Sequence, residues 1–354
     1  MFKKIFTLLP LLVLAAIAFA YLYTESSKAP LSPFAGFWDD GTSKVNQKIA
    51  KPLNLDFATS TELVSLNNIP RYIVYNAQTG EVYHAKNTSE FMSPASFSKL
   101  LSAQVALDLI PMDTVITATK DSVDKVPTVL GLKSGEKLPA GELLRGAIAT
   151  SANDAAQTLC DGAALANNYD QKDFIRLMNT KARLIGMKSS QFATTDGLDD
   201  EKQFSTLEDI AQLVHNVQVN YPEIASAASS DRQDIEKTED HGRYYLPNWN
   251  GLLGVYPGVN GLKIAYTEKA GYSTIVTATV KDKQFVAIVS GADSYLERDR
   301  AAADLLDAAL IAEKESPKKV NKWAINKRYQ EWGDLARKIK AELEATKAAT
   351  DVTP

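Results

Sequence analysis

The pattern of apolar and polar positions predicts one mixed domain of strands and helices. Residues Arg71–Asn87 alternate between apolar and polar around the turn Asn76–Gly80, which is typical of a β-hairpin. Two further alternating runs, Tyr272–Thr279 and Gln284–Val289, flank the turn Lys281–Lys283 and predict a second hairpin. Helical patterns lie between the hairpins. We therefore expect an α/β (α+β) fold whose terminal strands share one antiparallel sheet.

Apolar residues spaced by three or four predict the helices. The first helix, Ser96–Ile110, has an apolar face that includes Leu100, Leu101 and Val105. The same spacing recurs at Ala140–Ala163, Lys172–Ile185, Leu207–Val219 and Arg298–Ile311.

The start of the chain predicts export. Lys3 and Lys4 precede the apolar run Ile5–Tyr23, and Ala18–Ala20 matches an A-x-A cleavage site. The run is also close to the ~20 residues that span a bilayer. We expect residues 1–25 to be a signal peptide or an uncleaved membrane anchor. The domain would then lie in the periplasm or on the outer face of the cytoplasmic membrane.

The two flanks of the predicted domain, residues 69–315, differ from it in pattern. Residues 26–68 are poorly periodic and rich in proline, so we expect a tether there. Residues 316–354 are expected to form a basic amphipathic helix and tail, because basic residues outnumber acidic ones nine to four across residues 318–347. The apolar stripe of this helix is Ile325, Tyr329, Trp332, Leu335, Ile339 and Leu343. It fits a membrane interface or docking against the domain or a partner helix equally well.

Composition narrows the function classes. A net charge of −4 gives no overall attraction to nucleic acid. Cys160 is the only cysteine and the chain has only three histidines, which is a poor supply of metal ligands. We expect neither a metal nor another cofactor.

Candidate chemistry begins with the S-x-x-K motif Ser96–Lys99. On a helix, positions i and i+3 lie on one face, so the lysine can take the serine proton if burial lowers its pKa. The helix start also favours a developing oxyanion. The same pattern occurs at residues 122–125, 134–137 and 316–319, but only Ser96–Lys99 opens a strongly periodic helix.

The second candidate is Ser151–Asn153, between two helical stretches. A hydroxyl and an amide two residues apart can pass a proton to a leaving amine and hold a substrate carbonyl. Taken alone, this short pattern also fits a helix N-cap followed by its turn.

Four stretches resemble the low-molecular-mass serine D-alanyl-D-alanine carboxypeptidases, members of the penicillin-binding protein and serine β-lactamase-like superfamily. Met92–Leu101 resembles the nucleophile region P-A-S-x-T-K-L, and Thr150–Ala156 resembles S-G-N-D-A-A. Gly131–Lys137 resembles a connecting turn, and Tyr256–Lys263 resembles the approach to the third motif. The motifs occur in the family's order, and the resemblance runs from about Arg71 to Leu310.

The third motif departs from the family. Where the family has K-T-G, this chain has Lys263, Ile264 and Ala265. In the family the threonine hydroxyl helps to bind the substrate's terminal carboxylate, and Ile264 cannot donate that hydrogen bond. A hydrogen bond to a charged group is worth ~1.5–3 kcal/mol, so ~10–100-fold in substrate handling is at stake. Ala265 adds a methyl group where glycine allows close approach.

The resemblance implies a fold and a set of site residues. The fold is a serine β-lactamase/transpeptidase-like antiparallel sheet of about five strands flanked by helices, with a helical subdomain. Ser96 would be the nucleophile, with Lys99 as its base. Ser151 and Lys263 would relay the proton to the departing D-Ala. The implied substrate-binding residues are Asn153, Lys263 and Tyr266, and the Tyr266 N–H would form an oxyanion hole with the Ser96 N–H.

The implied function is a serine-type D-alanyl-D-alanine carboxypeptidase that acts on peptidoglycan pentapeptides and is inhibited by β-lactams. The membrane surface is the other expected partner, through the N-terminal segment and the C-terminal helix. Because the third motif is altered, two alternatives stay open. One is a D,D-endopeptidase, which needs no free carboxylate, and the other is a catalytically weak penicillin- or peptidoglycan-binding protein.

Overall fold

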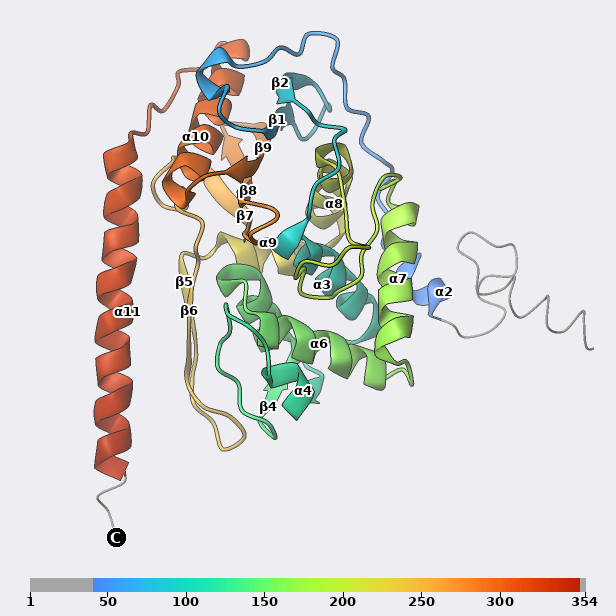
Figure 1. Ribbon diagram of the computed structural model, residues 1–354, viewed down its shortest axis with the longest axis vertical. Coiled ribbons are helices and arrows are strands. Elements are labelled where there is room, and N and C mark those ends of the chain that lie inside the picture. The colour runs from blue at the N-terminus through green and yellow to red at the C-terminus, as the bar shows by residue number, and fades with distance from the viewer. Residues whose placement is uncertain (1–40, 351–354) are drawn as a thin grey trace, which may run out of the picture.

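Five antiparallel strands form the central sheet of this computed structural model, which describes residues 41–350 and their side chains as far as residue 342 (Figure 1). The strand order is β2-β1-β9-β8-β7, so strands from both ends of the domain meet at the centre. This confirms the predicted antiparallel sheet of about five strands. The strands are β1 (Arg71–Asn76), β2 (Val82–Lys86), β7 (Val259–Ala265), β8 (Tyr272–Val280) and β9 (Lys283–Ala292).

Alternation along the strands places successive side chains in two separate cores. On β1, Ile73 and Tyr75 join the core beneath the helical region, while Tyr72 and Val74 join the core beneath helix α10 (Tyr295–Ala312). A strand that is buried on both faces must be apolar almost throughout, which is the pattern of β1 and β9.

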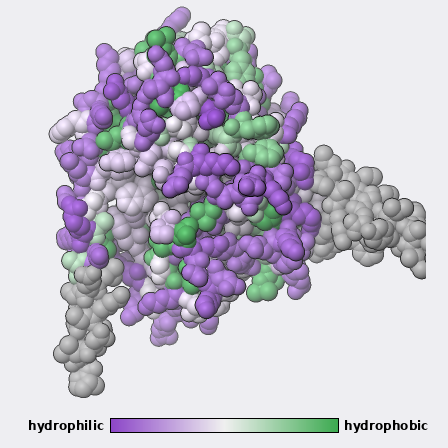
Figure 2. All heavy atoms as spheres, viewed as in Figure 1, coloured by the Kyte–Doolittle hydropathy of each residue, from purple (hydrophilic) through white to green (hydrophobic). Residues whose placement is uncertain are grey.

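Helices cover both faces of the sheet (Figure 1). Helix α10 packs on one face, and most of the other helices form the larger region on the opposite side. These other helices are α2 (Thr42–Val45), α3 (Ser98–Leu109), α4 (Lys120–Val123), α5 (Ala140–Arg145), α6 (Asn153–Leu165), α7 (Gln171–Leu184), α8 (Leu207–Asn220) and α9 (Pro222–Ser229). Two small ribbons complete the fold: β3 (Val115–Thr117) with β4 (Lys137–Pro139), and β5 (Arg232–Ile235) with β6 (Tyr244–Pro247). The face in Figure 2 is largely hydrophilic, with apolar side chains in small groups.

The helical pattern at Ala140–Ala163 is not one helix. A π-helical segment, Gly146–Thr150, follows α5, and Ser151 then adopts a left-handed conformation with φ +63°. Helix α6 starts only at Asn153. The break turns Ser151 out of the helical register, in agreement with the position predicted for it between two helical stretches.

Part of the predicted tether packs against the domain. Val45 is fully buried, and the buried ammonium of Lys181 donates to the carbonyls of Val45 and Lys48. Asp56 forms a parallel bridge with Glu81 at the sheet edge. The predicted signal peptide or anchor, residues 1–25, lies outside the described residues. Between residues 41 and 350, no helix is long and apolar enough to cross a membrane.

The C-terminal helix α11 (Lys322–Thr350) runs along one side of the molecule (Figure 1). Its first turns dock on the domain, because Ile325 and Trp332 of the predicted stripe are buried. The Trp332 ring contacts that of Trp249 edge to face, with centroids 5.7 Å apart. The N-terminal part of the predicted apolar stripe, from Ile325 to Trp332, therefore docks against the domain.

Candidate active site

Ser96 lies in a short 3-10 turn, Ala95–Phe97, directly before α3. Ala95 has φ +45°, an uncommon conformation for a non-glycine residue. The neighbours of Ser96 are buried while Ser96 itself is only partly covered. The turn therefore presents a hydroxyl to solvent from a rigid, buried support.

Lys99 is fully buried, and its Nζ lies 2.9 Å from Ser96 Oγ. The same ammonium donates to Asn153 Oδ1 at 2.7 Å and to the carbonyl oxygen of Asp196 at 2.5 Å. Burial lowers the pKa of Lys99 to about 8, and the carboxylate of Asp196 partly opposes that shift. A lysine with such a pKa has a substantial neutral fraction near neutral pH and can act as a base.

A second buried lysine, Lys263, faces Ser151 from strand β7. Its Nζ donates to Ser151 Oγ at 2.7 Å and to the Ile264 carbonyl at 2.9 Å. Burial holds the pKa of Lys263 well below its usual range, and the charges of Lys99 and Arg298 lower it further. The site thus contains two serine–lysine pairs, and both lysine side chains are buried away from solvent.

Asn153 connects the two halves of the site. Its Oδ1 accepts from Lys99, its Nδ2 donates to the Val126 carbonyl at 2.8 Å, and its backbone N–H donates to the Thr128 carbonyl at 2.7 Å. The next residue, Asp154, is buried and accepts hydrogen bonds from three consecutive backbone N–H groups at residues 130–132. These bonds fix the connecting turn against the start of α6.

The predicted residues surround one small pocket of about 110 Å³. Its lining brings together Ser96, Ser151, Asn153, Ile264, Ala265, Tyr266 and Thr267, with Pro127, Thr128 and residues 196–198 completing the wall. Lys99 and Lys263 lie behind this wall, each bonded to its serine. The side chain of Tyr266 is half exposed, whereas Ala265 is buried. Ile264 also lines the pocket, and it occupies the position where the family carries threonine.

The loop Asp196–Asp199 has functions that the sequence did not reveal. Besides the Asp196 carbonyl bound to Lys99, the Asp199 carboxylate accepts from Ser93 Oγ at 2.7 Å and from Thr267 Oγ1 at 2.9 Å. Asp199 thereby joins the segment before the nucleophile to the segment after β7. In sequence, Asp196–Asp199 also resembles a recurrent stretch of the D-alanyl-D-alanine carboxypeptidases, but that resemblance assigned it no role.

Replacing Gly197 with alanine should destabilise the protein by about 2–4 kcal/mol and slow acylation of Ser96. A Cβ there would lie 1.8 Å from the Ala95 carbonyl oxygen and 3.0 Å from the Ser96 nitrogen, so the nucleophile turn must move. Urea unfolding measures the first effect. Gly131→Ala is the control: φ is also positive but no atom lies within 4 Å, so it should cost only about 1 kcal/mol. Equal losses in the two variants would contradict the steric explanation.

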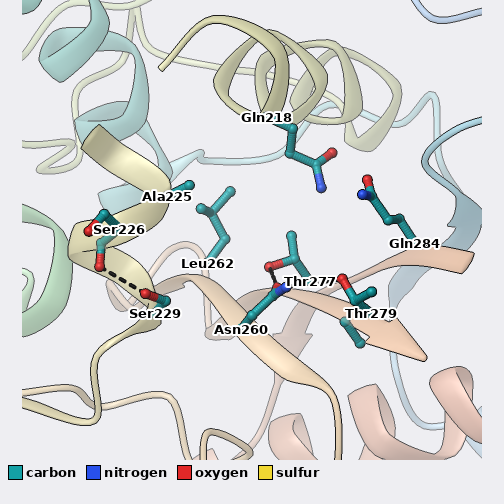
Figure 3. A pocket seen from close by; sticks show the side chains of 10 residues that line it. Gln218, Ala225, Ser226, Ser229, Asn260, Leu262, Thr277, Thr279 and Gln284 are labelled. Carbon is teal, nitrogen blue, oxygen red and sulfur yellow. Dashed lines mark hydrogen bonds between the residues drawn. The ribbon is translucent and has the colours of Figure 1, made fainter. Parts of the chain in front are cut away.

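A larger cavity of about 310 Å³ lies at the other end of β7 (Figure 3). Asn260 and Leu262 line it from β7, Ser226 and Ser229 from α9, and Gln218 from α8. None of its lining residues is ionisable or takes part in the serine–lysine pairs. This cavity is larger than the active-site pocket but holds no group that could act as a base or an acid.

The chain is similar in sequence to several curated D-alanyl-D-alanine carboxypeptidases. D-alanyl-D-alanine carboxypeptidase DacD of Escherichia coli (strain K12) is 32% identical over 247 residues, which cover 66% of this chain and 61% of that protein. The chain spans about 60% of the length of the curated relatives it matches first.

Solved structures share the fold. The D-alanyl-D-alanine carboxypeptidase DacD from Francisella tularensis matches with a TM-score of 0.64 at 24% identity, covering 75% of this chain and 74% of that one. Penicillin-binding protein D2 from Listeria monocytogenes, in its cefotaxime-bound form, matches with a TM-score of 0.58 at 28% identity, covering 68% of this chain and 97% of that one. Residues 65–294 match the family model described as D-alanyl-D-alanine carboxypeptidase, and the chain belongs to that family.

Proposed function

We propose that the chain is a serine-type D-alanyl-D-alanine carboxypeptidase that acts on peptidoglycan stem peptides through an acyl-enzyme. The observation that carries this proposal is the 2.9 Å approach of the buried Lys99 Nζ to Ser96 Oγ. In acylation, Ser96 Oγ bonds to the carbonyl carbon of the penultimate D-Ala, and its proton passes to neutral Lys99. The N–H groups of Ser96 and Tyr266 hold the oxyanion.

The second serine–lysine pair serves the leaving group. The peptide C–N bond breaks, and the proton that Lys99 took from Ser96 passes to the nitrogen of the departing D-Ala through Ser151, whose Oγ lies 2.7 Å from Lys263 Nζ. Asn153 positions the substrate amide, and its Oδ1 also holds Lys99 in place. Water then attacks the ester, which releases the shortened peptide and restores the Ser96 hydroxyl.

One observation also favours a D,D-endopeptidase activity. Ile264 lines the pocket and has no hydroxyl, whereas the family's threonine would bind a free carboxylate at this position. A peptide cross-link has no free carboxylate at this position, so the absence of the threonine hydroxyl costs it no hydrogen bond. The third hypothesis is a catalytically weak penicillin- or peptidoglycan-binding protein. It requires that Ile264 and Ala265 prevent the substrate from binding in a reactive position.

Location completes the proposal. The basic and apolar start of the chain supports export, with the domain in the periplasm or on the outer face of the cytoplasmic membrane. The membrane surface is the proposed second partner, through that segment and the basic C-terminal helix.

A fluorescent penicillin tests the proposed chemistry, because β-lactams resemble the D-Ala-D-Ala end. We expect covalent labelling of the chain and none of the Ser96→Ala variant. Release of D-Ala from a pentapeptide, compared with cleavage of a cross-linked dimer, separates the two enzyme activities. If the folded parent protein takes up no label, the acyl-enzyme proposal is wrong and the binding-protein alternative takes its place.

A further inference from the structure

Four tyrosines form a continuous series of ring contacts that begins at the active-site pocket. Tyr266, which lines the pocket, lies with its ring centroid 4.4 Å from that of Tyr272. Tyr272 is 6.4 Å from Tyr295, and Tyr295 is 4.5 Å from Tyr329. These residues are called the tyrosine track: Tyr266 directly follows β7, Tyr272 and Tyr295 begin β8 and α10, and Tyr329 lies in α11.

Part of the track is open to solvent. Tyr266 is 51% exposed and Tyr295 is 38% exposed, although both are large aromatic side chains. Tyr329 is anchored from behind, because its hydroxyl donates to the buried carboxylate of Asp299 at 2.6 Å and accepts from Arg298 at 2.7 Å. Rigid, exposed aromatic surface beside a catalytic pocket is typical of a ligand-binding groove.

The roles proposed for β7 give the direction of the substrate. The terminal carboxylate of the stem peptide would lie near Ile264, and the carbonyl attacked by Ser96 would lie at the Tyr266 N–H. The rest of the stem peptide, which leads back to the glycan strand, therefore continues past Tyr266 and along the tyrosine track.

The length of the stem peptide indicates which part of the substrate reaches the far end of the tyrosine track. In a pentapeptide the first residue lies three residues before the attacked position, which is about 10 Å in an extended chain. Steps of 4.4 and 6.4 Å carry the track from Tyr266 to Tyr295, which is the same scale. The group next to the first residue is the amino sugar that carries the stem peptide.

We propose that the far part of the tyrosine track, at Tyr295, is a subsite for the amino sugar of the glycan strand. The apolar C–H face of a pyranose ring packs well on the face of an aromatic ring, where the π-system is electron-rich. This proposal rests on the proposed function for its direction. It assigns Tyr295 the task of favouring stem peptides that are still attached to the glycan over free peptides.

Calorimetric titration with soluble glycan oligomers stripped of their stem peptides tests the subsite without any turnover. The full chain carrying Ser96→Ala should bind these oligomers, and adding Tyr295→Ala should weaken binding about 5–10-fold. Tyr295→Phe should bind like the parent, because it keeps the ring face, and its retained packing controls for folding. Tyr245→Ala, on the β5–β6 ribbon beside Arg232, is a control away from the track. Equal binding by Tyr295→Ala and its parent, or no binding by the parent, would overturn the proposal.

Turnover then separates this proposal from the proposed function. With Ser96 intact, Tyr295→Ala should lower kcat/KM about 5–10-fold on a disaccharide pentapeptide, mainly through KM, and should lower it by a clearly smaller factor on the sugar-free pentapeptide, which only reaches Tyr295 with its first residue. Equal losses on both substrates would refute the sugar subsite. If the parent fails to react with penicillin but its glycan binding still depends on Tyr295, the proposed enzyme activity fails and the subsite stands.

Discussion

Replacing Lys99 with methionine is expected to slow acylation of Ser96 by a fluorescent penicillin about 10²–10⁴-fold, the usual contribution of a general base. Methionine is apolar and of similar length, so it can occupy the buried space while removing the amine 2.9 Å from Ser96 Oγ. Rates of covalent labelling at saturating and subsaturating penicillin measure the effect.

The same role predicts a pH profile for the parent enzyme. Only neutral Lys99 can accept the Ser96 proton, and its pKa is lowered to about 8 by burial. Below that pH the neutral fraction falls, so the second-order labelling rate should drop about tenfold per pH unit. Above it the rate should level off. A rate that rises as the pH falls below 7 would contradict the assignment of Lys99 as the base.

Lys99→Arg provides the matched control for charge. Arginine keeps a cation near Asp196 but cannot lose its proton in the accessible pH range. We therefore expect Lys99→Arg to be as slow as Lys99→Met, and to lack the pH dependence near 8. If Lys99→Arg instead retained most of the labelling rate, Lys99 would act through its charge and not as a base.

Local patterns predicted the elements whose character is set by neighbours in the sequence. Helices α7 and α8 and strands β8 and β9 have strong periodicity, and their observed bounds lie within a few residues of those predicted. Strand β7 was different, because Gly258, Asn260 and Gly261 interrupt any alternation there. Only the resemblance to a family marked this stretch, as the approach to the third motif.

The parts of the site that could not be predicted depend on long-range contacts. The Asp196 carbonyl that binds Lys99 comes from 97 residues away, and any residue type could supply a carbonyl. Asp154 stood inside a recognised motif, but its three backbone partners at residues 130–132 belong to another segment. The left-handed conformation of Ser151 arises from the π-helical segment before it, for which a serine gives no signal.

Replacing Ile264 with threonine is expected to raise the release of D-Ala from a pentapeptide about 10–100-fold. Threonine is also β-branched, so it can keep the side-chain orientation at the pocket wall while a hydroxyl replaces part of the apolar surface. The backbone contact from Lys263 Nζ to the Ile264 carbonyl, 2.9 Å long, does not involve this side chain and should persist. Steady-state kinetics on a pentapeptide with a free C-terminus measures the gain, which we expect mainly in KM.

Ile264→Val distinguishes the hydroxyl from a change in volume, because valine has nearly the shape of threonine without the donor. If threonine gains activity and valine does not, the natural isoleucine limits recognition of the terminal carboxylate. A gain of the same size with valine would mean that Ile264 obstructs the pocket. No gain with either, in an enzyme that labels with penicillin, would indicate a substrate without a free carboxylate there. Cleavage of cross-linked dimers should then exceed D-Ala release in the parent chain, since Ile264 costs an internal peptide no hydrogen bond.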